Sequence, residues 1–308
     1  MRRFILIPHL KIHNANAMSS PYTIGFPAMT AWLGAVHALQ RHLNKNGYEK
    51  VQLFKVGVSC HHFNLQTYKG ANDFVHSIVG TANPLGKDGK RPAFIEEARC
   101  HLEVSLVVEF SGVSFVDDNE REYFNDCINN YLPRMKFASG DLMSCRKVEQ
   151  IRVDEDEYGA VKNLTNKLML GYVLIERREL MAQAMAQGKD ALDALLDHLK
   201  VMHRPVEDDD GKVTWPSPTR LVKGWLVPIA VGFQGISELG LAKHQRDAST
   251  PHRFAESVVT LGEFIMPYRI TDLDDMLWQY HVDLEHDLYV CQTDLSNTLI
   301  QHSITQTA

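Results

Sequence analysis

The sequence has few cysteines and no long hydrophobic run, the features that are typical of disulfide-bonded, membrane-spanning or secreted proteins. Its five cysteines are scattered and form no CxxC pair, which is typical of a reduced compartment. The most apolar runs, such as "GWLVPIAVGF" (Gly224–Phe233), are about half the ~20 residues that a spanning helix needs. The apolar "FILI" near the N-terminus is followed by Pro8, His9 and Lys11, so it is too short for a signal peptide. We therefore expect a cytoplasmic protein that does not enter a membrane.

Common catalytic and metal-binding motifs are also missing. The chain contains no GxxxxGK[ST], GxSxG or HExxH motif. The run Cys60-His61-His62 suggests a metal site, but successive side chains of a strand point to opposite faces. No second ligand pair stands at zinc-like spacing. We expect no catalytic residue, no metal and no cofactor.

Charge is distributed unevenly along the 308 residues. Residues 1–100 carry 12 Lys and Arg against 5 Asp and Glu, whereas the remainder carries 20 against 33. A basic N-terminal part on an acidic remainder indicates one surface that faces a polyanion. Chance asymmetry on solvated faces is the alternative. The RNA-recognition consensus with stacking aromatics is absent, so any RNA would be bound by another route.

Hydrophobic periodicity predicts the order strand, helix, strand, insertion, strand, helix, strand through residue 153. This is the ferredoxin-like βαββαβ arrangement, so the predicted fold class is α+β. We expect a core at residues 1–153 and a mixed α/β extension at residues 154–308 that packs on it. The predicted elements of the core are strands at 4–12, 51–68, 102–110 and 145–153, and helices from Pro27 to Leu43 and at 123–131.

The extension has fewer clear elements. Leucines at helical spacing predict a helix near residues 192–202, and an apolar run predicts a strand at residues 225–233. Thr250-Pro251 is typical of a helix start, with Phe254, Val258, Leu261 and Ile265 on one face. A last short helix is expected after Thr271.

The segment "NANAMSSPYTIGFPAM" (Asn14–Met29) is longer than the roughly 2–6 residues that connect a strand to a helix. Asn14, Asn16, Ser19 and Ser20 offer donors for phosphate and sugar oxygens, and the segment leads into a helix N-terminus, which favours anions. Alternatively, these side chains cap the segment's own backbone. Composition leaves the two interpretations level.

Several long blocks of the sequence resemble one protein family, the second Csy subunits of type I-F CRISPR surveillance complexes, within the RAMP superfamily. The order of the blocks is kept, and residues 154–218 carry little of the resemblance. The blocks are Ile12–Arg41, Asn83–Leu106, Gly224–Ile229, Thr250–Ile270 and Asp275–His281.

The resemblance implies a non-catalytic subunit that binds the 5′ handle of the CRISPR RNA. It implies a heterodimer with the large Csy subunit, contact with the backbone subunit, and target DNA reached through the assembled complex. It also implies a thumb inserted at about residues 64–97 and a glycine-rich loop at Ala138-Ser139-Gly140. The family often has two consecutive glycines in this loop, and here Ser139 precedes Gly140.

The candidate RNA-binding residues follow from the segment at 14–29 and from the resemblance. They are Asn14, Asn16, Ser19, Ser20, Lys87, Lys90, Arg91, Arg99, Ser139, Gly140 and Arg253. The cations could instead be solvated or serve as ion-pair partners.

Two other functions stay open. The first is a RAMP-type ribonuclease that cleaves CRISPR transcripts without a metal and uses a base such as His37 or His62. The second is a scaffold that contacts only other proteins.

Overall fold

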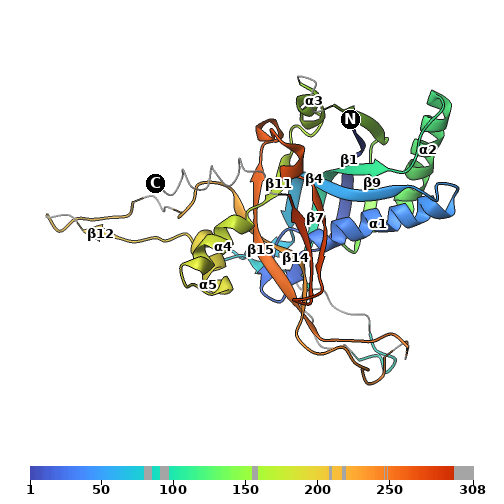
Figure 1. The fold of residues 1–308 in the computed structure, drawn as a ribbon. Helices are drawn as coiled ribbons and strands as arrows, with labels where there is room; N and C mark the ends of the chain where they lie inside the picture. Colours follow the sequence, from blue (N-terminus) through green and yellow to red (C-terminus); the bar gives the residue numbers. More distant parts are fainter. Residues whose placement is uncertain are drawn as a thin grey trace.

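Among the residues that the structure describes, eleven strands form one large antiparallel sheet, which organises the molecule (Figure 1). In this computed structural model, the described residues are 1–79, 85–90, 97–154, 159–207, 210–216, 220–245, 247 and 249–294. The chain is mixed α and β, as predicted. None of the helices among these residues combines the length and the apolar content needed to cross a bilayer.

The N-terminal part follows the predicted alternation of strands and helices, but the strand predicted at 145–153 is shortened to residues 149–153, and a separate strand at 140–144 begins in the predicted glycine-rich loop. In the sheet, β4 pairs with β7 and β7 pairs with β1. The other edge of β1 is shared by β9 and β10. All these pairings are antiparallel. The elements are β1 (Arg2–Asn16), α1 (Met29–Lys45), β4 (Gln52–Leu65), β7 (Arg99–Ser111), α2 (Asp118–Tyr131), β9 (Gly140–Ser144) and β10 (Glu149–Val153).

Helix α1 forms because its apolar residues recur at three- and four-residue spacing. Its buried face includes Trp32, Val36 and Leu39. The helix begins at Met29, later than predicted from Pro27, because the Ala28 backbone is still extended. It ends at Lys45, two residues after the predicted end at Leu43, with Asn46 as C-cap.

Strand β1 is longer than predicted and runs through the sheet interior. A proline inside a strand, here Pro8, is typical of an edge strand or a bulge. The edge interpretation is wrong, whereas the bulge is present between Ile7 and Leu10. Here β1 passes from its partner β10 to its partner β9, so the missing N–H of proline interrupts neither ladder.

The predicted connection at 14–29 is partly regular structure. Strand β1 continues to Asn16, and a small hairpin of β2 (Met18–Ser20) and β3 (Thr23–Ile24) follows before α1. The length of the segment is therefore explained by a hairpin that stands between the sheet and the helix.

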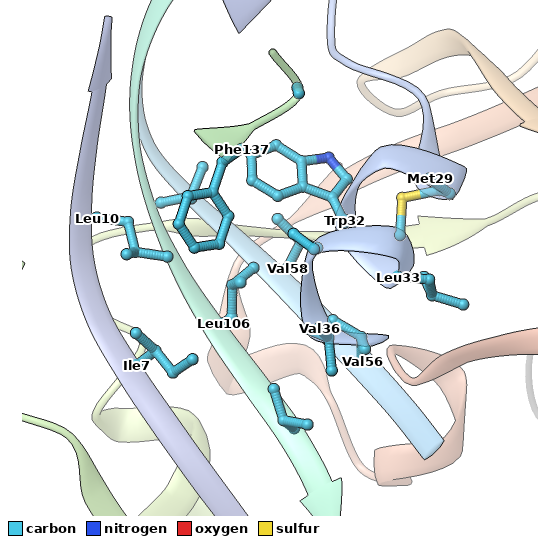
Figure 2. Packing of buried hydrophobic residues seen from close by; sticks show 14 of the residues in the cluster. Ile7, Leu10, Met29, Trp32, Leu33, Val36, Val56, Val58, Leu106 and Phe137 are labelled. Carbon is cyan, nitrogen blue, oxygen red and sulfur yellow. The ribbon is translucent and has the colours of Figure 1, made fainter. Parts of the chain in front are cut away.

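The two faces of the N-terminal strands are covered by different elements. Helices α1 and α2 cover one face, where Trp32 and Phe137 share a cluster with Ile7 and Val58 (Figure 2). The other face carries Phe4, Leu6 and Val107, covered by α3 (Ala160–Asn166), η3 (Leu273–Asp275) and Ile270, which follows the turn η2 (Pro267–Arg269). Successive side chains along each strand point to opposite faces of the sheet, and this alternation produces the two apolar layers.

The C-terminal strands extend the same sheet in the order β11-β15-β14-β17-β16-β4. Strand β11 also pairs with β4, which closes a ring of hydrogen-bonded strands. Helices α4 and α5 pack together on β14 and β15. The elements are β11 (Tyr172–Glu176), α4 (Arg178–Ala186), α5 (Ala191–Leu199), β14 (Leu226–Gly235), β15 (Ala255–Ile265), β16 (Trp278–Asp283) and β17 (Leu288–Thr293).

One predicted helix in this part is wrong. Residues 255–265 form strand β15, which pairs with β14 along its length and with β11 at its C-terminal end. The β-branched run Val258-Val259-Thr260 favours a strand, and pairing on both edges outweighs the helical spacing. The last helix shrinks to the turn η3, capped by Asp272. The predictions of a helix near 192–202 and a strand near 225–233 are confirmed by α5 and β14.

Shorter elements complete the chain. In the chain, β4 and β7 are separated by a two-stranded ribbon of β5 (Thr67–Tyr68) and β6 (Ser77–Ile78). This ribbon lies in the region of the predicted thumb. An extended arm carries β12 (Val206–Glu207) and β13 (Val213–Thr214) (Figure 1). The turn η1 (Leu132–Arg134) and β8 (Lys136–Phe137) lead into β9. The thumb boundaries and the division at residue 153 stay predictions.

Candidate nucleic-acid interface

A groove of about 470 Å³ runs between the N-terminal half of α1 and the loop that joins β8 to β9. It brings together Asn16, Ser19 and Ser139, three predicted RNA-binding residues from distant parts of the sequence. The lining consists of Asn16, Ser19, Pro27, Ala28, Thr30, Ala31, Gly34, Ala35, Ala38, Lys136, Ala138 and Ser139.

The α1 wall of the groove is made of small residues. Ala31, Ala35 and Ala38 share one face at helical spacing, so a ligand can approach the helix closely. No side chain in the described part of the chain caps the N-terminus of α1, and its first turn holds no acidic residue. The first-turn N–H groups and the helix dipole therefore favour an anion at this end.

The opposite wall is a strained loop that is pressed against β1. Ala138 and Ser139 have φ of 48° and 66°, the left-handed region that glycine adopts most readily. A Cβ on Gly140 would lie 2.6 Å from Ile12 Cγ2 and 2.7 Å from the His13 carbonyl oxygen. The Asn16 N–H donates to the Ala138 carbonyl at 2.8 Å. These contacts fix the loop and leave Ser139 exposed at its tip.

The polar side chains of the hairpin also stabilise their own segment. Asn16 Oδ1 accepts from the Met18 N–H at 3.0 Å, and the Ser19 hydroxyl lies 3.0 Å from the Thr23 hydroxyl. Ser20 is buried and bonds to the same Thr23 hydroxyl at 2.7 Å. One of the two amide hydrogens of Asn16 and a lone pair of the Ser19 hydroxyl remain available for hydrogen bonds. These two side chains can therefore still bind a ligand.

Asn14 and Arg99 lie beside the groove. Asn14 is exposed with φ of 54°, and its N–H donates to His101 Nδ1 at 3.1 Å. The Arg99 guanidinium pairs with Glu97 and donates to the Asn14 carbonyl at 3.4 Å. Arg99 therefore joins the start of β7 to the end of β1 and is partly neutralised.

Lys87, Lys90 and Arg253 do not line the groove. Lys87 and Lys90 are exposed in the turn at residues 85–90, where Lys90 Nζ lies 4.0 Å from the Asp88 carboxylate. Arg253 pairs with Asp287 of the β16–β17 turn. Arg91 lies outside the described residues.

Sequence reasoning missed Lys136, a cation in the groove lining. Its Nζ lies 2.6 Å from Asp141, and both side chains are mostly exposed, so this ion pair costs little to break. The available signal was its position two residues before the predicted loop Ala138-Ser139-Gly140. The described lining of the groove holds no carboxylate.

Neither candidate base of the ribonuclease alternative lies in the groove lining. His37 is exposed on α1, and His62 lines a different pocket. Burial and the neighbouring His9 lower the pKa of His61 to about 4. Among the described residues, no group of three or more His, Cys, Asp or Glu side chains could hold a metal.

Comparisons with known proteins agree on one family. The family model described as "CRISPR-associated protein (Cas_Csy2)" matches residues 5–291. The curated "CRISPR-associated protein Csy2" of Pseudomonas aeruginosa (strain UCBPP-PA14) is 33% identical over 323 residues, covering 97% of each chain. The chain therefore belongs to the Csy2 family, whose members are subunits of type I-F CRISPR systems.

Proposed function

We propose that this chain is a non-catalytic RNA-binding subunit that holds the 5′ handle of the guide RNA in the groove between α1 and the β8–β9 loop. The observation that carries the proposal is the meeting of Asn16, Ser19, Ser139 and Lys136 at the uncapped N-terminus of α1. Membership of a CRISPR-associated family supports a guide RNA as the ligand.

The chemistry of the groove suits an RNA backbone. Hydroxyl, amide and backbone N–H donors bind phosphate and ribose oxygens, and Lys136 adds a positive charge. The small residues of α1 leave room for a polymer, and the exposed Asp141 carboxylate that pairs with Lys136 would be displaced by a phosphate. Target sequence would be read by guide pairing rather than by this chain.

The proposal includes a ferredoxin-like RAMP core. The antiparallel order β4-β7-β1 followed by β9 and β10 supports this assignment, because it corresponds to the order 2-3-1-4 of the predicted core strands. The β5–β6 ribbon supports a thumb inserted between β4 and β7. Lys87, Lys90 and Arg91 are proposed as thumb cations that meet the guide.

The proposed partners are the large Csy subunit as a heterodimer, the backbone subunit, and target DNA through the assembled cytoplasmic complex. The acidic composition of residues 101–308 supports contacts with basic partner surfaces and discourages non-specific nucleic-acid binding. Arg99 and Arg253 would act at the margins of these contacts.

Fluorescence anisotropy with guide RNA, with and without its 5′ handle, tests the groove. Ser139→Glu places a carboxylate at the loop tip and should weaken binding of handle RNA roughly tenfold, about 1.4 kcal/mol. Ser114→Glu is the matched control, since Ser114 is exposed and lies outside the groove. Equal affinities for the two variants would contradict the proposal.

Two further measurements separate the alternatives. Incubation with unprocessed repeat RNA should leave the RNA intact, and cleavage that is lost in His37→Ala or His62→Ala would support the ribonuclease. A protein-only scaffold predicts that substituting Asn14, Asn16 and Arg253 leaves the RNA content of the assembled complex unchanged.

A further inference from the structure

An aromatic pocket of about 310 Å³ lies on the other side of the segment that borders the groove. It is formed by the β2–β3 hairpin, β4, β11, β14 and β15, so both the N-terminal and C-terminal strands build it. Five aromatic side chains contribute to its lining, namely Phe26, Phe63, Tyr172, Trp225 and Phe264.

The aromatic rings form a connected set of edge and tilted contacts. Ring centroids lie 5.3 Å apart for Phe26 and Phe264, 5.4 Å for Trp225 and Phe264, and 5.2 Å for Tyr172 and Trp225. Despite these contacts, Trp225 remains 53% exposed, while Phe63 and Tyr172 each remain 38% exposed. The rings therefore keep free surface on which a ligand can pack.

The described lining of the pocket contains no aspartate, glutamate, lysine or arginine. Its two histidines are His61, whose Nε2 is engaged by the Ser105 hydroxyl at 2.7 Å, and His62, which is exposed. An uncharged ring fits these walls better than a phosphate does.

The pocket and the groove share one stretch of backbone. Phe26 lines the pocket, and the next residue, Pro27, lines the groove. Likewise, Ser19 on one strand of the hairpin borders the groove, while Ile24 on the other borders the pocket. A polymer whose backbone lies in the groove thus has the pocket within reach of its side groups.

We propose that this pocket takes one unstacked nucleobase of the single-stranded RNA whose backbone lies in the groove. The inference rests on the proposed function, because it assumes RNA in the groove. RNA readers recognise splayed bases by stacking them on aromatic side chains, and such stacking tolerates any base because every base has a π-face. The exposed His62 at the pocket supplies a hydrogen-bonding group for a base edge.

Trp225 is a built-in reporter for this site. Handle RNA added to the full-length protein should quench tryptophan fluorescence in the wild type and in Trp215→Phe, which removes an exposed tryptophan outside the pocket. In Trp225→Phe the quenching should disappear while binding, followed by anisotropy, persists. Quenching that is unchanged in Trp225→Phe would overturn the inference.

Affinity gives the second measurement. Trp225→Ala should weaken RNA binding roughly 5- to 150-fold, the range expected for one lost base stack, whereas Trp215→Ala should not change it. Far-UV circular dichroism verifies that both variants fold. An unchanged affinity for Trp225→Ala would also overturn the inference.

The outcomes distinguish this inference from the proposed function. RNA binding that depends on Ser139 but not on Trp225 would reject the base pocket and retain the groove. No RNA binding by the wild type would reject the proposed function itself. Quenching of Trp225 by the purified large Csy subunit without RNA would assign the pocket to a protein side chain and overturn the inference.

Discussion

The groove and the aromatic pocket lie on two sides of the same short segment but are built from different materials. The groove consists of backbone groups, small residues, hydroxyls and Lys136. The pocket is lined by aromatic and aliphatic side chains and two histidines, and its described lining contains no carboxylate, lysine or arginine. The contrast matches the two parts of a nucleotide, whose phosphate needs donors and positive charge and whose base needs a flat apolar surface.

The groove and the pocket also differ in the structural elements that form them. The groove depends on close backbone approach, since Gly140 is pressed against β1. The pocket depends on strands from both halves of the chain, because Trp225 and Phe264 belong to the C-terminal strands and Phe63 to β4. Substitutions should therefore affect the two sites separately.

Gly140→Val should give the largest effect on the groove. The added Cβ would lie 2.6 Å from Ile12 Cγ2 and 2.9 Å from Ala15 Cα, so the loop must leave β1, at a cost of about 3 kcal/mol. Urea unfolding followed by circular dichroism measures this loss. Gly34→Ala is the control, because Gly34 has open space around its Cα and should gain about 1 kcal/mol in the helix. A Gly140→Val variant that is as stable as the wild type would contradict the close approach at Gly140.

Lys136 and Asp141 should change RNA affinity in opposite directions. Lys136→Gln removes the cation and should weaken binding about tenfold, and it should flatten the log-affinity salt slope by roughly 0.7. Asp141→Asn removes the carboxylate 2.6 Å from Lys136 Nζ and should tighten binding. Anisotropy titrations over a range of salt concentrations measure both. A salt slope unaffected by either variant would place the phosphates elsewhere.

Ser139→Gly should have a smaller effect. Glycine adopts the left-handed backbone of Ser139 (φ 66°) without the penalty of a Cβ, which predicts a gain of about 0.5 kcal/mol in stability. If the loop binds RNA through its backbone, affinity should stay unchanged. A loss of affinity with unchanged stability would show instead that the hydroxyl makes the contact.

His61→Gln should change the stability at neutral pH least of all these variants. The wild type and the variant should differ in how their stability falls at acidic pH. Burial and His9 lower the pKa of His61 to about 4 from its ordinary 6.5, so the folded state binds this proton less readily than the unfolded state. The stability that neutral His61 contributes is present above pH 6.5 and is lost as pH falls toward 4. The charged neighbours that act on it are His9, Glu103 and Arg146.

Urea unfolding at several pH values between 4 and 8 checks this prediction. The wild type should lose more stability than His61→Gln as the pH is lowered. If stability depended on pH in the same way for the two proteins, the pKa of His61 would not be lowered in the folded state.

Much of the N-terminal fold was predictable because its signals are local. The apolar residues of α1 recur at helical spacing and those of β7 recur at every second position. Each pattern predicts one buried face, and both elements are present. The prediction for residues 254–265 failed because a helical spacing also occurred by coincidence in a strand. There the pairing of β15 with β14 and β11 decided the outcome.

The candidate site was predictable only in part. Asn16, Ser19 and Ser139 were expected to bind RNA, and the structure brings them to one groove, although their role remains a proposal. Lys136 was missed because a single lysine beside a turn has no distinguishing pattern. Trp225 and Phe264 looked like ordinary strand residues, and nothing in their spacing indicated a shared pocket with Phe26.

The sequence by itself determined the family, the order of the N-terminal strands and helices, and the basic bias of the first hundred residues. These follow from local spacing, composition and long matching blocks. Only the tertiary structure decided that the C-terminal strands join the same sheet, that Gly140 closes on β1, and that a groove and an aromatic pocket share the segment around Phe26 and Pro27. Such juxtapositions depend on contacts between residues far apart in the chain, which no local pattern encodes.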